Sequence, residues 1–341
     1  MPKVSIIVLN WNGKQFLKNC LDSLRKLTYK SVEIIIVDNN STDGSQEFIK
    51  KYYPKFILVE NKKNYGFARG NNIGFHKSKG KYVLFLNNDT VVSPSFLESL
   101  VDDLEKDSKI GCIQPQIRLT SEKDRLDQMG SYISFVGFLY HYGYRKKYSE
   151  KTYGKRREIF SAKGACIMFS SKLLKKIGLF DEDFFIFFEE TDLCFRVWLS
   201  GYRVVYEPKS TIYHVVGGDT TASDKYKYER RIYLIFRNTN CSYLKNFGTQ
   251  NLLTVYPIFL GVQFCIFMLF LIKLRFDLLR AIIRAYWWNI VNLRNTLKKR
   301  KHVQHDIRKV SDRYLDQFIK LTPRPSYYYY SLFKTTQEYN D

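Results

Sequence analysis

The N-terminal half of the chain alternates short apolar runs with segments whose apolar residues recur at helical spacing. The apolar runs occupy residues 4–9, 32–37, 56–60 and 82–86, and polar turn residues follow each of them. Uninterrupted apolar runs of this kind are typical of strands that are buried on both faces of a sheet. The pattern therefore predicts βαβ units, and hence an α/β fold with a mainly parallel sheet flanked by helices.

A weakly patterned stretch interrupts this rhythm before further elements follow. Residues 111–157 predict one strand and then loops that contain several glycines and tyrosines, and there we expect the determinants of specificity. From residue 161 the pattern again predicts ordered structure, with helices near 172–177 and 189–201 and short strands at 202–206 and 211–214.

The βα alternation ends near residue 224, and the remaining chain is apolar and basic. Residues 252–272 carry no charge and are long enough to span a bilayer. Residues 276–297 alternate apolar and basic positions at helical spacing, which is typical of an interfacial amphipathic helix. We therefore expect an α/β domain at 1–224 and a helical, membrane-associating region at 225–341.

The distribution of charged residues indicates which kinds of partner the protein binds. The formal net charge is +22, and eleven basic residues but only two acidic ones lie between Lys273 and Lys309. This excess directly follows the most apolar segment, which favours an anionic membrane surface. A basic nucleic-acid-binding protein would instead interleave its basic residues with exposed aromatics on a recognisable module. We therefore expect no nucleic-acid partner.

The N-terminus and the cysteines indicate the compartment. The first apolar run begins at Val4 and is too short for a signal peptide, so we expect the α/β domain in the cytosol. A single span at 252–272 would then place the basic segment outside, against the positive-inside tendency. A re-entrant or interfacial segment at the cytoplasmic face of the membrane is preferred to one transmembrane helix. The six scattered cysteines form no C-x-x-C pair, so we expect them to be reduced.

Polar residues at the ends of predicted strands are the first candidates for chemistry. Asn87, Asn88 and Asp89 follow the strand at 82–86, and ligands of open α/β sheets bind at such carboxyl ends. Asp89 could hold a divalent cation, Mg²⁺ or Mn²⁺, and through it a diphosphate. His214, at the end of another strand, is the expected second ligand. Taken alone, the Asn-Asn-Asp sequence is more typical of a turn, and the surrounding motifs favour the metal site.

Two further groups of polar residues could contact a nucleotide. Asparagine and aspartate side chains after the first two strands suit a nucleobase and a ribose. A third cluster opens a helix, and its glycines would let the backbone approach a ligand closely. Alternatively, these are ordinary polar turns and a capped helix. The candidates are Asn10, Asn12, Asp38, Asn40, Asn64, Gly66, Phe67, Asn71 and Asn88.

Three carboxylates open the predicted helix at 189–201. Glu189, Glu190 and Asp192 follow an apolar aromatic run, and the helix dipole stabilises their ionised forms. An ionised carboxylate in a dry pocket can take a proton from an attacking hydroxyl. Asp192 and Arg196 share a helix face with Glu189 and could form a structural pair, while Glu190 points elsewhere. An acidic first turn without a catalytic role is the alternative.

Several motifs in one order together resemble family 2 glycosyltransferases, particularly the rhamnosyltransferase-like branch. The resemblance covers about residues 3–216 and rests on VSIIVLNWNG (4–13), VDNNSTDGS (37–45), NYGFA (64–68), LNNDT (86–90) and EETDLCFR (189–196). It implies the GT-A fold of nucleotide-diphospho-sugar transferases. It also implies sugar transfer to a hydroxyl of a glycan or lipid-linked acceptor, usually with inversion, in synthesis of cell-surface polysaccharides or glycoconjugates.

The resemblance also implies roles for single residues. Asp38 would hold the base or ribose, Asp89 would bind the metal within the D-x-D position, and His214 matches a late histidine of the family. Glu190 stands where the family has its catalytic base, with Glu189 and Asp192 as substitutes. Two positions depart from the family pattern, because Asn87 replaces the first Asp of D-x-D and Glu190 replaces the usual Asp.

Other functions fit parts of the sequence. The two departures leave open an inactive relative that binds a nucleotide sugar without turning it over. A nucleotidyltransferase shares the sheet architecture but needs a glycine-rich phosphate loop, of which residues 10–14 are a poor version.

Overall fold

The apolar runs of the N-terminal half form adjacent parallel strands. In the computed structural model, which describes residues 1–215 and 225–320, the order is β3-β2-β1-β4. These strands are β1 (Val4–Asn10), β2 (Val32–Asp38), β3 (Ile57–Glu60) and β4 (Tyr82–Asn87). Alternate side chains of β1 and β2 enter two hydrophobic cores, one on each face, which explains their unbroken apolar sequence.

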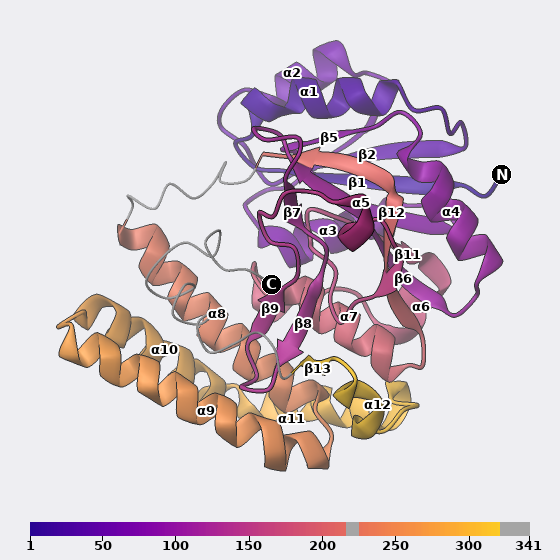
Figure 1. Ribbon diagram of the computed structural model, residues 1–341. Helices are drawn as coiled ribbons and strands as arrows, with labels where there is room; N and C mark the ends of the chain where they lie inside the picture. The colour runs from indigo at the N-terminus through magenta and orange to yellow at the C-terminus, as the bar shows by residue number, and fades with distance from the viewer. Residues whose placement is uncertain (216–224, 321–341) are drawn as a thin grey trace.

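Helices cover both faces of the sheet (Figure 1). One face packs against α1 (Lys14–Arg25), α2 (Ser45–Tyr52) and α4 (Phe96–Lys106). The other packs against α3 (Gly66–Lys77), α6 (Ser171–Ile177) and α7 (Glu189–Leu199). The polar ends of β1, β2 and β4 therefore meet at one sheet edge, as the βαβ pattern predicts.

Beyond β4 the sheet is mixed rather than mainly parallel. The order continues β11-β6-β12-β10, and β11 runs antiparallel to both β4 and β6. Short strands β5 and β7 pair with β12 and β6. The bounds are β5 (Thr90–Val92), β6 (Ile110–Leu119), β7 (Leu126–Gln128), β10 (Arg157–Glu158), β11 (Cys166–Ser170) and β12 (Arg203–His214).

Strand β12 combines two strands that the sequence separates. Its register with β6 shifts between Glu207 and Thr211, where Pro208 has no N–H to donate to a strand partner. The strand continues past this irregularity and pairs with β5, so that His214 lies opposite Thr90. This pairing brings the end of β12 to the turn that follows β4.

The weakly patterned stretch contains a second sheet that the sequence did not predict. Its order is β13-β8-β9, with β8 (Ser131–Ser134), β9 (Leu139–His141) and β13 (Ile319–Lys320). The short helix α5 (Glu150–Tyr153) also lies in this stretch. Because β13 pairs with β8, the C-terminal part of the described chain returns to the α/β part.

Long helices form the C-terminal region and pack at the end of the molecule opposite α1 and α2 (Figure 1). The predicted helix at 276–297 is divided at Asn292, and the uncharged stretch lies within α9. Within the described residues, α9 is the one helix long and apolar enough to cross a membrane. The bounds are α8 (Lys225–Asn246), α9 (Thr249–Ile272), α10 (Phe276–Val291), α11 (Leu293–His302) and α12 (Asp312–Asp316), with single turns at Glu182–Phe184 and Val303–Ile307.

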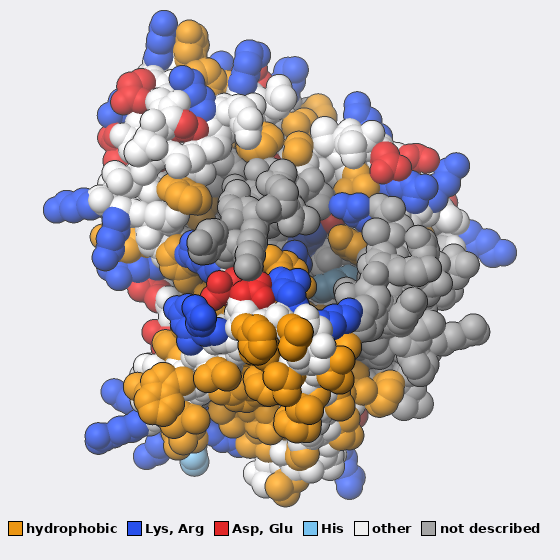
Figure 2. Space-filling model, turned by 90° about the vertical axis from the view of Figure 1, so that its left-hand side faces the viewer, with side chains coloured by type: hydrophobic (Ala, Val, Ile, Leu, Met, Phe, Trp, Pro, Cys, Tyr) orange, Lys and Arg blue, Asp and Glu red, His pale blue; other side chains and the backbone are white. Residues whose placement is uncertain are grey.

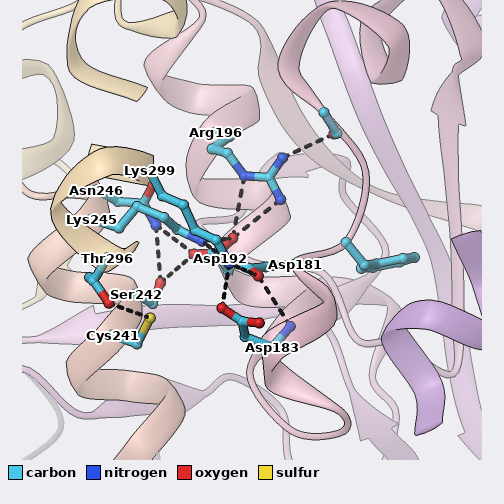
Figure 3. Close-up of polar contacts among 12 residues, drawn as sticks. Asp181, Asp183, Asp192, Arg196, Cys241, Ser242, Lys245, Asn246, Thr296 and Lys299 are labelled. Atoms are coloured by element: carbon cyan, nitrogen blue, oxygen red, sulfur yellow. Dashed lines mark hydrogen bonds and ion pairs between the residues drawn. The ribbon is translucent and has the colours of Figure 1, made fainter. Parts of the chain in front are cut away.

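A buried group of charged residues joins these helices to α7 (Figure 3). We call Asp181, Asp192, Arg196, Lys245 and Lys299 the interhelix ion cluster. Lys245 Nζ lies 2.6 Å from Asp181 Oδ2 and 3.0 Å from Asp192 Oδ2, and Lys299 Nζ lies 2.5 Å from Asp181 Oδ1. The C-terminal helices are thus fixed to the α/β part by buried ion pairs. The predicted boundary at residue 224 lies outside the described residues.

All six cysteines are free. Five are buried, and Cys265 is exposed on α9.

Candidate active site

Strand β12 brings the two predicted metal ligands together. His214 Nε2 lies 3.2 Å from Asp89 Oδ1, although the contact is not aligned as a hydrogen bond. On the other side of the ring, His214 Nδ1 lies 2.7 Å from Asp127 Oδ2. Asp127 is fully buried and also accepts a hydrogen bond from Lys163 Nζ at 2.6 Å. Neither Asp127 nor Lys163 was predicted as a site residue, because Asp127 lies in the weakly patterned stretch and Lys163 shortly follows it.

Asp127 orients the imidazole. A proton on Nδ1, donated to Asp127, leaves the Nε2 lone pair facing Asp89. Burial alone would lower the pKa of His214, but the hydrogen bond to Asp127 and the charge of Asp89 outweigh it, so the pKa is raised. For Asp127, burial opposes ionisation, but Lys163 and His214 hold the pKa well below its usual range.

These groups fit a divalent cation that is shared with a phosphate. Asp89 Oδ1 is buried and has no hydrogen-bond partner, and it faces an imidazole nitrogen. Within residues 1–215 and 225–320, no three His, Cys, Asp or Glu side chains converge on one point. Two protein ligands leave most coordination positions for phosphate oxygens and water, which is the usual arrangement of Mg²⁺ at nucleotides.

The carboxylates of α7 separate into two kinds. Glu189 Oε2 and Glu190 Oε2 are buried and have no hydrogen-bond partner. Burial raises the pKa of Glu190, and Lys163 partly opposes the shift. Burial and then the charge of Glu190 raise the pKa of Glu189 further. A pair of close, desolvated carboxyl groups favours one shared negative charge.

Glu190 lies beside the predicted donor motif. A Cβ added to Gly164 would lie 3.8 Å from Glu190 Cδ and 3.5 Å from Phe67 Cζ. Glu190 therefore faces the start of α3, where Asn64, Gly66 and Phe67 were proposed to approach the donor.

Asp192 occupies a different environment. Its Oδ1 accepts hydrogen bonds from Ser242 and Asn246, and its Oδ2 accepts from Arg196 and Lys245 (Figure 3). The predicted pairing of Asp192 with Arg196 is confirmed. With both oxygens fully engaged inside the interhelix ion cluster, Asp192 holds helices together.

A strained aromatic loop leads into the carboxylates at the start of α7. We call residues 185–188 the aromatic loop; Phe185, Phe187 and Phe188 have φ values of 63°, 73° and 72°. Such positive values are uncommon outside glycine and persist only where the surroundings fix them. Here Asn238 Nδ2 of α8 donates to the carbonyls of Phe184, Ile186 and Phe187 at 2.7–3.0 Å.

The aromatic loop also explains Gly66. Phe185 O accepts hydrogen bonds from Phe67 N and Ala68 N, at 2.6 and 3.2 Å, in the first turn of α3. Gly66 has φ +77°, and a Cβ there would lie 2.6 Å from Phe185. Close packing against the protein therefore requires this glycine, where the sequence suggested close approach to a ligand. Asn64 Oδ1 accepts from Gly66 N, and buried Asn71 Oδ1 has no hydrogen-bond partner.

The predicted nucleotide side chains form one hydrogen-bonded chain across three strand ends. Asn88 Nδ2 donates to Asn10 Oδ1 at 2.7 Å, and Asn10 Nδ2 donates to Asp38 Oδ2 at 2.8 Å. Asp38 also accepts from Ser41 and Gln46, so its carboxylate already has several donors. These contacts fix the turns after β1, β2 and β4 relative to one another.

Asn12 and Asn40 lie at the exposed rim of the same edge. Both adopt left-handed backbone conformations, with φ of 48° and 62°. Asn12 Oδ1 accepts from Thr42 N at 2.8 Å, which ties the first turn to the second. The structure thus brings Asn10, Asn12, Asp38, Asn40, Asn88, Asp89 and His214 to one sheet edge, with Glu190 and Phe67 beside Gly164.

Comparison with known proteins agrees with this geometry. A family model described as glycosyl transferase family 2 matches residues 5–178. The chain is 32% identical over 126 residues to an uncharacterized glycosyltransferase of Haemophilus influenzae, covering 36% of this chain and 39% of the relative. It is 25% identical over 217 residues to the poly-beta-1,6-N-acetyl-D-glucosamine synthase of Staphylococcus epidermidis, covering 62% and 50%. The chain therefore spans half or less of the length of these relatives.

Solved structures share the fold at low identity. GalNAc-T7, in complex with UDP, GalNAc and Mn²⁺, superposes with a TM-score of 0.57 at 17% identity, over 72% of this chain and 48% of that one. The mannosyltransferase PcManGT of Pyrobaculum calidifontis, in complex with GDP-Man and Mn²⁺, gives 0.52 at 16% identity, over 85% and 87%. The predicted GT-A fold is confirmed, whereas the rhamnosyltransferase-like branch stays a prediction.

Proposed function

Since the chain belongs to glycosyltransferase family 2, we propose that it moves a hexosyl or rhamnosyl group from a nucleotide-diphosphate donor to a hydroxyl of a glycan or lipid-linked acceptor. The reaction inverts the anomeric centre and serves synthesis of a cell-surface polysaccharide or glycoconjugate. Glu190 carries the proposal, because its buried carboxylate oxygen has no hydrogen-bond partner and lies beside Gly164 and Phe67. Residues 1–224 supply the catalytic domain and 225–341 the membrane-associating region.

Each group of side chains has a separate task. The turns that Asp38 organises, with Asn10, Asn12, Asn40 and Asn88, bind the nucleoside. Asp89 and His214 would hold Mg²⁺ or Mn²⁺, which neutralises charge on the departing diphosphate. Structural neighbours that bind Mn²⁺ with UDP or GDP-Man support this assignment.

Glu190 acts as the base. Its carboxylate takes the proton of the acceptor hydroxyl as the hydroxyl oxygen attacks the anomeric carbon, and the nucleoside diphosphate leaves. Burial and the charge of Glu190 raise the pKa of Glu189, so the pair favours a single negative charge, which the proposal assigns to Glu190. Lys163 supports the ionised form of Glu190.

Release of nucleotide by the purified chain tests this assignment. A panel of UDP-, dTDP- and GDP-sugars with Mn²⁺ or Mg²⁺ should identify one donor that is slowly hydrolysed. Asp89→Ala should abolish metal-dependent release, and Glu190→Gln should lower turnover by about 100-fold or more while donor affinity is kept. Glu105→Gln, at an exposed site of α4 beside the start of β4, is the matched control. Wild-type turnover in Glu190→Gln would exclude the base role, and donor binding without turnover in the wild type would indicate an inactive relative.

We also propose that helices α9–α11 dock on the cytoplasmic face of the membrane. Hydrophobic side chains cover this end of the molecule (Figure 2). A contiguous exposed apolar surface of this kind marks an interaction site. We call the following exposed residues the apolar face: Leu253, Ile258, Phe264, Leu271, Ile272, Leu274, Phe276, Ile283, Trp287 and Ile290. Exposed basic residues of the same region complement an anionic surface: Lys273, Arg275, Arg280, Arg284, Arg294 and Lys298.

The packing of α9 favours an orientation in the membrane plane. Its buried stripe includes Phe259 and Gln263, and Gln263 Oε1 accepts hydrogen bonds from Asn240 of α8 and Tyr286 of α10. Because α9 is held along its length by these helices, crossing the bilayer would carry the arginines of α10 into hydrocarbon, which is costly. Lying in the interface keeps both flanks of α9 on one side.

Flotation with phosphatidylcholine–phosphatidylglycerol vesicles tests the docking. The wild-type chain should float with the vesicles and be released at alkaline pH, as expected for a protein that does not span the bilayer. The double variant Ile283→Glu/Ile290→Glu should stay at the bottom of the gradient, because two charges would enter the interface. Tyr52→Glu/Ile57→Glu, which adds the same two charges at exposed sites on α2 and β3, should still float. Unchanged flotation of the double variant would exclude this face.

A further inference from the structure

A basic cavity lies between α8 and α10, beside the aromatic loop. Its volume is about 440 Å³, and its walls include Phe185, Glu229, Arg230, Tyr233, Arg237 and Arg284. The donor edge, formed by the turns after β1, β2 and β4, contributes no residue to these walls. The cavity is therefore separate from the donor edge and lies near the loop that precedes Glu189 and Glu190.

The charges of this cavity suit a phosphate. Three guanidinium groups face one carboxylate, and Arg284 Nη1 is 3.9 Å from Glu229 Oε1, beyond hydrogen-bond distance. Arg230 is exposed and has no ion-pair partner in residues 1–215 and 225–320. Guanidinium groups bind both phosphate and carboxylate oxygens through paired N–H donors. The higher negative charge of a phosphate matches three guanidinium groups better than the single charge of a carboxylate.

Arg237 gives the cavity a fixed element. It is buried, and its Nη2 donates to the carbonyls of Asp183 at 2.6 Å and Phe184 at 2.9 Å. Its Nε donates to Asn238 Oδ1 at 2.8 Å, while Nη1 has no hydrogen-bond partner in the described part of the chain. A guanidinium that is already held in place loses little conformational entropy when it binds an anion.

The cavity is adjacent to the acceptor side of the site. Phe185 forms one wall, the guanidinium carbon of Arg230 lies 4.9 Å from the centre of that ring, and Phe185 begins the loop that leads to Glu189 and Glu190. A phosphate in the cavity would thus hold its substituent next to the base.

The cavity also borders the apolar face. Arg284 lines it, and the preceding residue, Ile283, lines a second cavity of about 370 Å³ between α9 and α10, whose walls include Phe264 and Trp287. Figure 2 shows charged side chains between the hydrophobic end of the molecule and the hollow above it. With the apolar face in the bilayer, the arginines lie at the depth of lipid phosphates.

Building on the proposed transfer reaction, we propose that Arg230, Arg237 and Arg284 bind the phosphate or diphosphate of a lipid-linked acceptor. The hydrocarbon chain of this acceptor lies in the bilayer against α9 and α10. The saccharide that the phosphate carries extends past Phe185 toward Glu190. The acceptor class is therefore a phosphorylated lipid carrier and excludes a soluble glycan.

Vesicles that differ only in one lipid test the cavity. Phosphatidylcholine vesicles doped with geranylgeranyl diphosphate, geranylgeraniol or phosphatidylglycerol are titrated with the full chain, and tryptophan fluorescence reports binding because Trp287 and Trp288 lie on α10. The wild type should bind the diphosphate vesicles at least about tenfold more tightly than either other kind. Arg230→Ala/Arg284→Ala should remove that preference. Arg280→Ala/Arg294→Ala, which loses the same charge from exposed sites outside the cavity, should keep it.

The other outcomes overturn the proposal. Equal binding to diphosphate and phosphatidylglycerol vesicles would mean that any anionic surface suffices for binding. Equal losses of affinity for the diphosphate vesicles in both double variants would lead to the same conclusion. Donor hydrolysis is measured on the same preparations. If the wild-type chain hydrolyses the donor but shows no preference for diphosphate vesicles, only the assignment of the cavity is refuted. If the chain hydrolyses no donor, the proposed transfer is refuted, and the vesicle titration still tests the cavity independently.

Discussion

At the scale of single residues, the charges around Glu190 would set the pH range in which the proposed base is ionised. Burial raises the pKa of this carboxyl, and Lys163 is the cation that opposes the shift. A base works only when ionised, so a raised pKa moves the acid limb of the pH–rate profile above the usual range of a glutamate. Lys163 extends activity toward lower pH.

Removing the charge of Lys163 should therefore shift this limb. In Lys163→Met the pKa of Glu190 rises further, so turnover begins at a higher pH than in the wild type. The measurement is kcat/KM for donor consumption across pH. Lys163→Arg keeps the charge and should restore the profile, whereas Lys172→Met, which removes a charge from the exposed surface, should leave the profile in place. An unmoved limb in Lys163→Met would contradict this role.

The sequence predicts the candidate site residues at strand ends but not the residues that hold them in position. Asp89 and His214 stand out because each follows an apolar run. Asp127 contacts His214 across 87 positions of sequence, within a stretch that carries no regular pattern. This contact depends on the pairing of β6 with both β7 and β12, which no local pattern specifies.

At the scale of elements, the aromatic loop depends on a helix from the other half of the chain. Asn238 of α8 donates to two carbonyls of the loop and to that of the preceding Phe184, and the strained conformation persists because of these bonds. The position of Glu189 and Glu190 at the start of α7 is therefore set partly by α8.

Asn238→Ala should release the loop. Leaving buried carbonyls without donors costs about 1–3 kcal/mol of stability. Turnover should fall by more than this loss of stability explains, because Glu190 moves. Donor affinity should change little. Asn240→Ala is the matched control, since Asn240 is a buried asparagine of the same helix that bonds Gln263 of α9 instead of the loop. Denaturant unfolding and steady-state kinetics measure the two effects, and equal turnover in both variants would refute the coupling.

The predicted elements were accurate where the pattern was local. Strands β1 to β4 and helices α6 and α7 lie within a few residues of their predicted positions. The sheet of β8, β9 and β13 was not predicted, because its strands are very short and β13 pairs with residues far away in the sequence. The predicted helix at 276–297 is divided at Asn292, whose backbone has φ −94° and ψ 9° and whose side chain donates to Trp288 O.

At the scale of the whole molecule, the interhelix ion cluster makes the C-terminal helices part of one folded body. Burial raises the pKa of Asp181, but Lys245 and Lys299 outweigh it and hold the pKa well below its usual value. The stabilisation is fully present above the ordinary aspartate pKa near 3.8 and is lost as pH falls through the lower folded value. The sequence shows these charges but cannot show that they are buried together.

Lys245→Met should destabilise the whole chain. It leaves the carboxylates of Asp181 and Asp192 with one cation fewer inside the protein, which costs about 3–5 kcal/mol. Denaturant-induced unfolding at neutral pH measures the change. Lys298→Met, an exposed neighbour of Lys299, should have an effect within about 0.5 kcal/mol. Similar losses in the two variants would show that the cluster contributes little.

The cysteines offer a consequence of a different kind. Five of the six thiols are buried, and Cys265 alone is exposed, next to Phe264 of the apolar face. A maleimide dye should therefore attach at one position in the native protein, without any engineered thiol. An environment-sensitive dye at that position would report the polarity around α9 and so the depth to which this helix enters a lipid layer.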